Sequence, residues 1–349
     1  MVRWTIITII IFFVLGSILV NACKKSGDEN DSGPHPLSFT VPAGFPAPVY
    51  QFEGNPLTEE GFELGRKLFY DGRLSKDGNF PCASCHQQFA AFATFDHDLS
   101  HGFNNQFTTR NSPGLFNIAW IPELHWDGGI NHLEVQPLAP ITAPNEMAED
   151  INNVISKLQQ DAEYKRLFKV AFGDETINSQ RMLLAITQFV GSLVSADSKY
   201  DRVKRGQARF TEAEQNGYAI FQSKCTGCHV EPLFTDNSFR NVGLPVDPVL
   251  KDYGRMRITN RPEDSLKFKV PSLRNVALTF PYGHDGRFSA VTSVLDHYSD
   301  GVQEGANVDP LVRGGITLSN FDKFYLGEFL KTLTDSAFIH NPRFAQPQQ

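Results

Sequence analysis

The sequence predicts a mainly α-helical protein with long loops and little strand, organised as two halves of related design. Apolar residues recur at helical spacing behind capping signals, one residue pattern occurs twice, and few stretches show the alternation typical of strands. The length of 349 residues is enough for about two domains. An aromatic share of 12%, which includes 29 Phe, excludes a disordered chain.

The helices of the first half are predicted from their ends and from their apolar spacing. A helix over residues 58–69 has Thr58 as a suitable N-cap and two acidic residues in its first turn. Two further helices are predicted at 149–158 and 161–172, and the second ends before a glycine. Residues 179–193 carry apolar side chains spaced for one buried face: Met182, Leu183, Ile186, Phe189, Val190 and Leu193.

The second half shows similar signals. A helix over 211–222 begins with a capping box, in which Thr211 is followed three residues later by Glu214. Helices are also predicted at 291–298 and 320–333. We place the boundary between the halves so that residues 48–200 form the first domain and 201–349 the second, with a C-terminal tail able to pack back on the first.

The N-terminus has the shape of a secretory signal. A basic start at Arg3 precedes 17 uncharged residues, and Ala22 stands directly before Cys23. Residues 1–22 resemble a bacterial lipoprotein signal, in which Cys23 becomes the lipidated first residue. An uncleaved membrane anchor is the alternative, because the run reaches the lower limit for crossing a bilayer. Either way, we expect a periplasmic or cell-envelope protein tethered to a membrane, with residues 23–47 as a flexible linker.

The other four cysteines fall in two identical C-x-x-C-H patterns. Cys82, Cys85 and His86 form the first, and Cys225, Cys228 and His229 form the second. This is the attachment sequence of a c-type haem, whose vinyl groups bond to the two thiols. The histidine that follows supplies the proximal ligand of the iron. The sequence therefore predicts two covalently bound haem c groups.

Three other uses of these cysteines were weighed. A Cys₄ zinc site normally has its C-x-x-C pairs about 15–20 residues apart, whereas these pairs are 143 apart. A redox-active C-x-x-C pair does not explain a histidine after each pair. Structural disulfides within C-x-x-C would close almost no loop.

The repetition extends beyond the cysteines. Six residues recur at a constant shift of 158: Pro113, Leu115, Asn117, Ala119, Asp127 and Gly128 match Pro271, Leu273, Asn275, Ala277, Asp285 and Gly286. The fold class predicted is therefore mainly α, with two cytochrome c-like haem domains related by internal duplication.

Several motifs between residues 58 and 333 carry a family resemblance. They are the paired C-x-x-C-H, H-G after the first pair, R-N-S-P, W-D-G, Q-x₉-E-M and V-P-S-L-R-N-V-A-L-T-x-P-Y. In these motifs the chain resembles the bacterial di-haem cytochrome c peroxidases. That family includes the MauG-like branch, whose members oxidise a partner protein.

The resemblance implies roles around the first haem. His86 would be the proximal ligand of the low-potential haem at which peroxide reacts, and His101 the distal ligand that must leave, with His97 as a nearby rival. Glu146 would be the acid/base carboxylate and Gln136 the amide beside it.

It also implies roles around the second haem and between the haems. Trp126 would relay electrons, and His229 would be the proximal ligand of the electron-transfer haem. Tyr298 stands where typical peroxidases have an axial Met and the MauG branch has Tyr, with His297 as an alternative ligand. Three residues match the family's calcium site: Asn111, Thr279 and Pro281.

Three functions are open. The first is a peroxidase that reduces hydrogen peroxide to water with electrons from a small cytochrome c or a cupredoxin. The second is a MauG-like oxidase that acts on a protein or aromatic substrate, which Tyr298 favours. The third is a non-catalytic di-haem electron carrier. A homodimer around calcium is possible in such a family, and the net charge of −7 argues against a nucleic-acid partner.

Overall fold

The structure is a computed structural model that describes residues 33–348. The predicted signal peptide 1–22, Cys23 and the linker as far as residue 32 lie outside the described residues. From Pro34 onwards the chain forms one compact unit. None of the helices in this described stretch combines the length and the apolar character that a membrane crossing requires.

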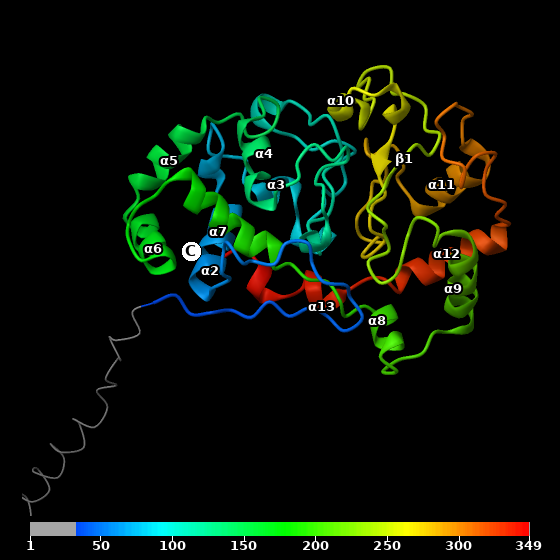
Figure 1. Ribbon diagram of the computed structural model, residues 1–349, viewed down its shortest axis with the longest axis horizontal. Helices are drawn as coiled ribbons and strands as arrows, with labels where there is room; N and C mark the ends of the chain where they lie inside the picture. Colours follow the sequence, from blue (N-terminus) through cyan, green and yellow to red (C-terminus); the bar gives the residue numbers. More distant parts are fainter. Residues whose placement is uncertain (1–32, 349) are drawn as a thin grey trace, which may run out of the picture. The chain divides into compact units, whose positions relative to one another are not determined.

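The unit is mostly helical, as the sequence predicts (Figure 1). Its helices are α2 (Glu59–Phe69), α3 (Cys82–Cys85), α4 (Leu138–Thr142), α5 (Ile151–Gln159), α6 (Ala162–Phe172), α7 (Ser179–Gly191), α8 (Lys199–Lys204), α9 (Glu212–Lys224), α10 (Met256–Thr259), α11 (Val291–Asp296), α12 (Asn320–Lys331) and α13 (Ser336–Ile339). Within residues 33–348 the strands are β1 (Phe239–Arg240) and β2 (Phe268–Lys269), which pair antiparallel.

Several predicted helix ends are confirmed by their caps. The Thr58 side chain accepts a hydrogen bond from the backbone of α2, and Asp161 does the same for α6. The α6 helix ends at Gly173, whose φ of 89° suits glycine. Thr211 and Glu214 form the predicted capping box of α9.

Other predicted ends are wrong by a few residues. The α5 helix begins at Ile151 rather than 149, because Asp150 accepts from the backbone of Asn152 and caps it. The α7 helix ends at Gly191, although Leu193 is fully buried beyond it. The apolar spacing of residues 179–193 indicates which side chains are buried, and this burial continues past the end of the helix. The last predicted turn before Tyr298 is a π-helical turn, His297–Gly301.

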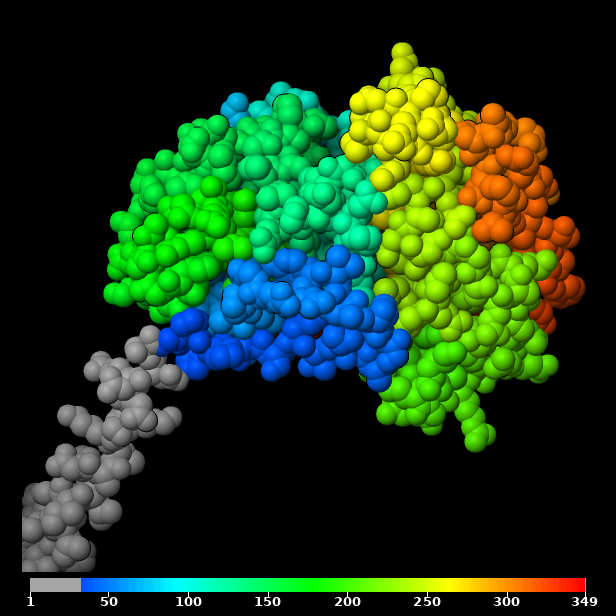
Figure 2. Space-filling view, in the orientation of Figure 1, coloured from blue at the N-terminus to red at the C-terminus, as the bar shows by residue number. Residues whose placement is uncertain are grey.

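Part of the segment predicted as a flexible linker is packed on the compact unit. The Leu37 N–H donates to the Leu57 carbonyl, and the Glu59 N–H donates to the His35 carbonyl. The Phe45 ring meets Trp120 edge to face, with centroids 5.4 Å apart. The chain from Pro34 therefore lies on the surface of the unit as an ordered strap (blue in Figure 2).

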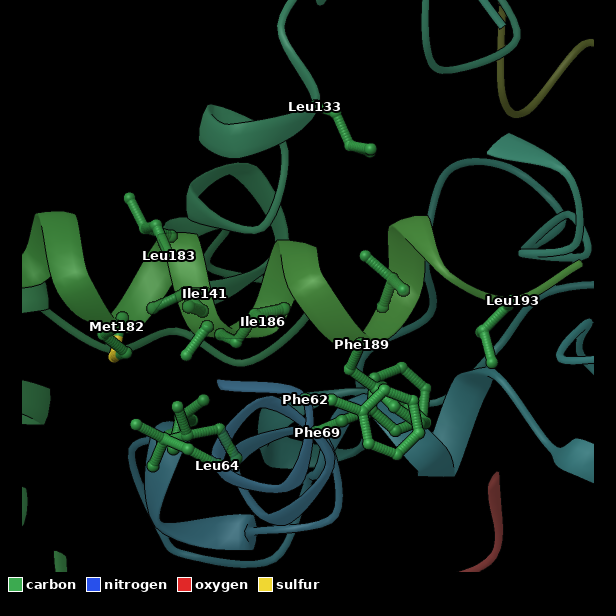
Figure 3. Close-up of a cluster of buried hydrophobic side chains, with 14 of the residues drawn as sticks. Phe62, Leu64, Phe69, Leu133, Ile141, Met182, Leu183, Ile186, Phe189 and Leu193 are labelled. Atoms are coloured by element: carbon green, nitrogen blue, oxygen red, sulfur yellow. The ribbon is translucent and has the colours of Figure 1, made fainter. Parts of the chain in front are cut away.

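The first hydrophobic cluster forms where α2 crosses α7 (Figure 3). A Cβ on Gly65 would lie 1.9 Å from the Ala185 carbonyl oxygen, so only glycine allows this crossing. The rings of Phe62, Phe69 and Phe189 fill the space beside it. Phe338, near the C-terminus, also belongs to this cluster.

The second hydrophobic cluster forms where α9 packs against α12. Here a Cβ on Gly217 would lie 1.9 Å from the Tyr325 carbonyl oxygen. Phe221 and Phe329 pack beside the crossing, with ring centroids 5.1 Å apart. The two clusters are built alike, and each has its glycine on the helix that precedes one C-x-x-C-H pattern. The internal duplication stays a prediction.

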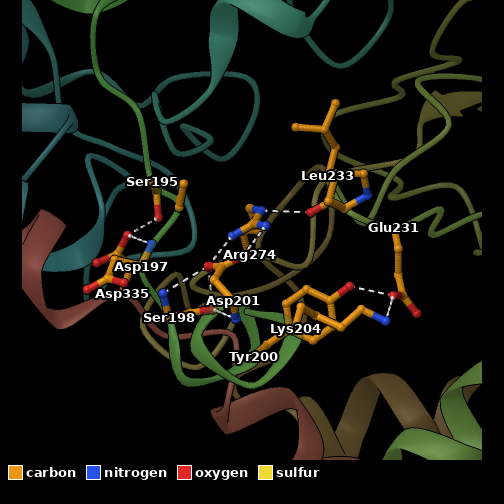
Figure 4. Close-up of polar contacts among 12 residues, drawn as sticks. Ser195, Asp197, Ser198, Tyr200, Asp201, Lys204, Glu231, Leu233, Arg274 and Asp335 are labelled. Carbon is orange, nitrogen blue, oxygen red and sulfur yellow. Dashed lines mark hydrogen bonds and ion pairs between the residues drawn. The ribbon is translucent and has the colours of Figure 1, made fainter. Parts of the chain in front are cut away.

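A buried ion pair fixes the chain after the second cysteine pattern (Figure 4). The fully buried Arg274 guanidinium donates to both carboxylate oxygens of Asp201, at 2.9 and 2.8 Å. Although burial alone would raise it, the ion pair with Arg274 holds the pKa of Asp201 below its usual value. Arg274 also donates to the Pro232 carbonyl, three residues after His229. The Arg274–Asp201 ion pair thus connects α8 to the loop that follows the second C-x-x-C-H pattern.

Candidate functional site

The two cysteines of the first C-x-x-C-H pattern begin and end the short helix α3, and His86 is its C-cap residue. The His86 Nδ1 atom lies 2.8 Å from the Phe92 carbonyl oxygen. Burial lowers the pKa of His86, so the ring is neutral, with its proton on Nδ1 for that carbonyl. The Nε2 atom is therefore left with a lone pair, which is the arrangement that an iron ligand needs.

The second pattern has the same local arrangement. Cys225 ends α9, and the His229 Nδ1 atom lies 3.0 Å from the Phe234 carbonyl oxygen. Burial lowers the pKa of His229 as well. Cys225 and Cys228, like the cysteines of the first pattern, are free and partly exposed.

These features fit haem attachment better than the other uses of cysteine. All four thiols are unpaired, which does not support the disulfide alternative. In residues 33–348 no group of three or more His, Cys, Asp or Glu side chains could hold a metal ion, which does not support a Cys₄ zinc site. Free thiol pairs beside an oriented histidine are what two haem c groups require.

Glu146 lies near the first pattern, in a setting unusual for a carboxylate. Burial raises the pKa of its carboxyl group, and no ion pair with another residue of 33–348 opposes the rise. Burial also raises the pKa of the Cys85 thiol, and the nearby Glu146 charge adds to that rise. Its neighbour Glu149, in contrast, forms an ion pair with Lys157. The structure therefore separates an unpaired, titratable Glu146 from structural acidic residues.

Gln136 has a partner that the sequence analysis missed. Its Nε2 atom lies 3.3 Å from the Nε2 atom of His125, the residue before the W-D-G motif. The charge of His125 also acts on His86, which places His125 on the same side of the fold as the first pattern. The sequence signal that could have pointed to His125 is its place directly before the W-D-G motif.

Trp126 lies where residues of the two halves meet. Its indole N–H donates to the Asn111 carbonyl at 2.8 Å, and its own carbonyl accepts from the Lys269 N–H at 2.7 Å. Arg110 holds the same place by donating to Asp127, at 2.6 Å, and to Asp252, at 2.5 and 2.9 Å. Trp126 is thus held by both halves of the chain, its ring through Asn111 and its backbone through Lys269.

Tyr298 lies close to the second pattern. Burial raises the pKa of its phenol, and the nearby Cys228 and Cys225 thiols raise it further. No hydrogen bond from another described residue reaches its hydroxyl group. The rival His297 has its Nε2 atom 2.9 Å from the Val242 carbonyl oxygen, so that nitrogen is already engaged. The geometry favours Tyr298 over His297 as the side chain facing this site.

The structure also brings the two histidines of the first loop together. The rings of His97 and His101 are 5.1 Å apart, and His101 packs on Phe107. The His101 Nδ1 atom lies 3.0 Å from the Asn105 side-chain oxygen, which leaves its Nε2 atom available. Gly102 packs against the backbone of Glu146, so this loop lies beside that carboxylate. Distal ligation by His101 stays a prediction.

Asn111 lies beside the segment that holds the other two predicted calcium ligands. Its N–H donates to the His284 carbonyl at 2.8 Å, and its side-chain nitrogen donates to the Asp98 carbonyl at 3.1 Å. Thr279 and Pro281 precede His284 by a few residues. Carbonyl oxygens of this kind suit calcium, and the calcium site stays a prediction.

Comparison with known proteins identifies the family. The family described as di-haem cytochrome c peroxidase matches residues 59–209. The methylamine utilization protein MauG of Methylophilus methylotrophus is 34% identical over 307 residues, which cover 86% of this chain and 88% of that protein. The chain belongs to the di-haem cytochrome c peroxidase family.

Other relatives in the family carry both kinds of name. The cytochrome c551 peroxidase of Nitrosomonas europaea is 36% identical over 241 residues, which cover 67% of this chain and 71% of that protein. A solved structure described as a MauG-like protein associated with microbial copper homeostasis is 34% identical, with a TM-score of 0.81. It matches over 89% of this chain and 99% of its own. Membership supports two haems and an oxidoreductase, and it leaves open which electron donor is used.

Covalent attachment can be tested directly. We expect the intact mass of exported protein to exceed that of the polypeptide by two haem groups. The double variant Cys82→Ala/Cys85→Ala should lose one of them and keep the other, because Cys225 and Cys228 are untouched. Mass spectrometry of the denatured protein measures this, and a wild-type chain without porphyrin mass would contradict the assignment.

Proposed function

We propose that this protein is a MauG-like di-haem oxidase that consumes hydrogen peroxide and takes electrons from a protein or aromatic substrate. The observation that carries this choice is Tyr298, whose phenol lies beside Cys225 and Cys228 without a hydrogen-bond partner among the described residues. A hard phenolate oxygen favours ferric iron and lowers the potential, whereas methionine raises it. A low-potential second haem is a poor acceptor for electrons from a small cytochrome c.

The proposal assigns the peroxide chemistry to the first pattern. Cys82 and Cys85 would hold the haem covalently, His86 would be its proximal ligand, and the bound haem would supply the redox chemistry for O–O cleavage. Glu146 takes the proton of one peroxide oxygen and returns it to the other, which leaves as water. Burial raises the pKa of Glu146, which makes this carboxyl a stronger base and suits it to take the proton and then return it.

Electrons must then enter from the substrate through the second site. Reduction of one hydrogen peroxide to two water molecules takes two electrons and two protons, which the oxidised substrate supplies. Trp126 is held between the halves by Asn111 and Lys269, a position that supports its role as the relay. His101 is the proposed distal ligand that leaves before peroxide enters.

A cytochrome c peroxidase is the second candidate, and it was the first choice from the sequence. It is favoured by the likeness to the cytochrome c551 peroxidase of Nitrosomonas europaea, which is 36% identical. In this case a small cytochrome c or a cupredoxin would donate the electrons. A non-catalytic electron carrier is not favoured, because it gives no role to Glu146, whose carboxylate has no ion-pair partner among the described residues.

We further propose export and tethering through a lipid on Cys23, with calcium bound near Asn111. The basic start, the uncharged run and the small residue before Cys23 support the first proposal. The strap from Pro34 onwards would then connect the anchored end to the compact unit. A homodimer around calcium is a further part of this proposal.

The identity of the electron donor distinguishes the oxidase from the peroxidase. Haem-loaded protein should consume peroxide slowly with a reduced cytochrome c as sole donor and faster with a protein or aromatic substrate. The measurement follows cytochrome oxidation by absorbance and peroxide loss in parallel samples. Rapid, saturable turnover with the cytochrome would establish the peroxidase instead.

Removing the Glu146 carboxylate should slow the reaction with peroxide. We expect Glu146→Gln to lower the rate by about 10²–10⁴-fold, since the amide cannot carry the proton. The matched control is Glu175→Gln, which changes an exposed carboxylate. Stopped-flow absorbance measures both, and equal rates in Glu146→Gln and wild type would remove this assignment.

Replacing the proposed phenolate ligand should shift the second haem. We expect Tyr298→Met to raise its reduction potential and to change its ferric absorption spectrum, because thioether sulfur stabilises ferrous iron. Tyr253→Phe, which changes an exposed tyrosine, should leave both unchanged. A spectroscopic redox titration measures the potential, and an unmoved value in Tyr298→Met rejects Tyr298 as ligand.

A further inference from the structure

His125 occupies a backbone conformation that suits glycine. Its φ is 64°, in the left-handed region that few residues with side chains adopt. At the shift of 158 the corresponding residue is Gly283, with a φ of 92°. Both turns close with the same hydrogen bond, from Leu124 N–H to the Ile130 carbonyl at 2.6 Å and from Tyr282 N–H to the Phe288 carbonyl at 2.7 Å. A strained residue of this kind persists where its side chain has a use.

The ring of His125 faces the amide of Gln136. The Nε2 atoms of the two side chains are 3.3 Å apart. An amide nitrogen can only donate, so the ring nitrogen must be the acceptor, and the imidazole is neutral with its proton on Nδ1. Burial lowers the pKa of His125, Lys269 and Arg110 lower it further, and only Asp127 opposes them. The surroundings of the ring therefore favour this neutral form.

The contact decides which end of the Gln136 amide is engaged. Its nitrogen is turned to His125, and its oxygen remains as the group that another molecule can meet. An amide oxygen accepts a hydrogen bond from the O–H of hydrogen peroxide or water, but it cannot donate to an anion. We propose that His125 is a positioning residue that orients Gln136 with its oxygen toward the peroxide site. The peroxide site belongs to the proposed function, on which this inference rests.

The orientation can be tested with fluoride, an anion that binds ferric haem and only accepts hydrogen bonds. His125→Gly keeps the left-handed turn, as Gly283 does in the second half, and removes the ring. The freed amide can then turn its nitrogen toward the anion. We expect fluoride to bind His125→Gly about tenfold more tightly than wild type, the gain that one net hydrogen bond gives. Absorbance titration of the ferric protein measures this affinity, with the parent and every variant compared in a His101→Gly background so that the proposed distal ligand does not occupy the fluoride position.

Two further variants show whether the effect passes through Gln136. In His125→Gly/Gln136→Leu the gain should disappear, because no amide is left to turn. His125→Asn should bind fluoride like wild type, because asparagine tolerates the left-handed turn and offers an oxygen to the Gln136 nitrogen. The matched control is His132→Gly, since His132 is exposed in the same loop region.

The results separate this inference from the proposed function. Fluoride binding needs no turnover, so an inactive oxidase with the predicted fluoride series would reject the function and keep the role of His125. Unchanged or absent fluoride binding in His125→Gly would overturn the inference, as would a gain that persists without Gln136. If His125→Gly does not fold, His125→Asn carries the test: fluoride binding like wild type supports the inference, and a changed affinity overturns it.

Discussion

The hydrogen bond between a backbone carbonyl and the histidine of each C-x-x-C-H pattern is the constraint on which both sites depend. His86 and His229 each present Nδ1 to a carbonyl, that of Phe92 and that of Phe234. Both phenylalanines have positive φ values, 59° and 56°, which turn the chain back toward the imidazole. These backbone conformations cost free energy, but they place the carbonyls that fix the tautomer and the ring plane of each histidine, as a metal ligand requires. Phe92 and Phe234 are themselves fully buried, so core packing holds the carbonyls in place.

The sequence could predict the parts of this fold that have local causes. The capping box of Thr211 and the N-cap Thr58 depend on residues within one turn, and both are present as predicted. The C-x-x-C-H patterns are equally local, because the cysteines and the histidine are consecutive in the chain. The end of α7 could not be predicted, because Leu193 is buried by residues distant in sequence.

The missed features depend on contacts between distant segments. The strap after Pro34 is rich in proline, and its order comes from pairing with the chain around Leu57 and from the contact of Phe45 with Trp120. His125 was passed over because its partner Gln136 becomes visible only when the turn closes. The difference between Glu146 and Glu149 also depends on a contact between distant segments, because Lys157 forms an ion pair with Glu149 and not with Glu146. Local sequence could not have distinguished these cases.

One residue connects the two turns that match at the shift of 158. Asn111 accepts from the indole of Trp126 in the first turn, and its N–H donates to the carbonyl of His284 in the second. In the second turn His284 stacks on Phe268 at 3.6 Å, and burial lowers the pKa of His284 to about 4, so this ring is uncharged. Similar turns therefore carry different groups, the indole proposed as the relay in one and a neutral stacked imidazole in the other. Because the backbone of one residue bonds to both turns, a shift of either turn is coupled to the other.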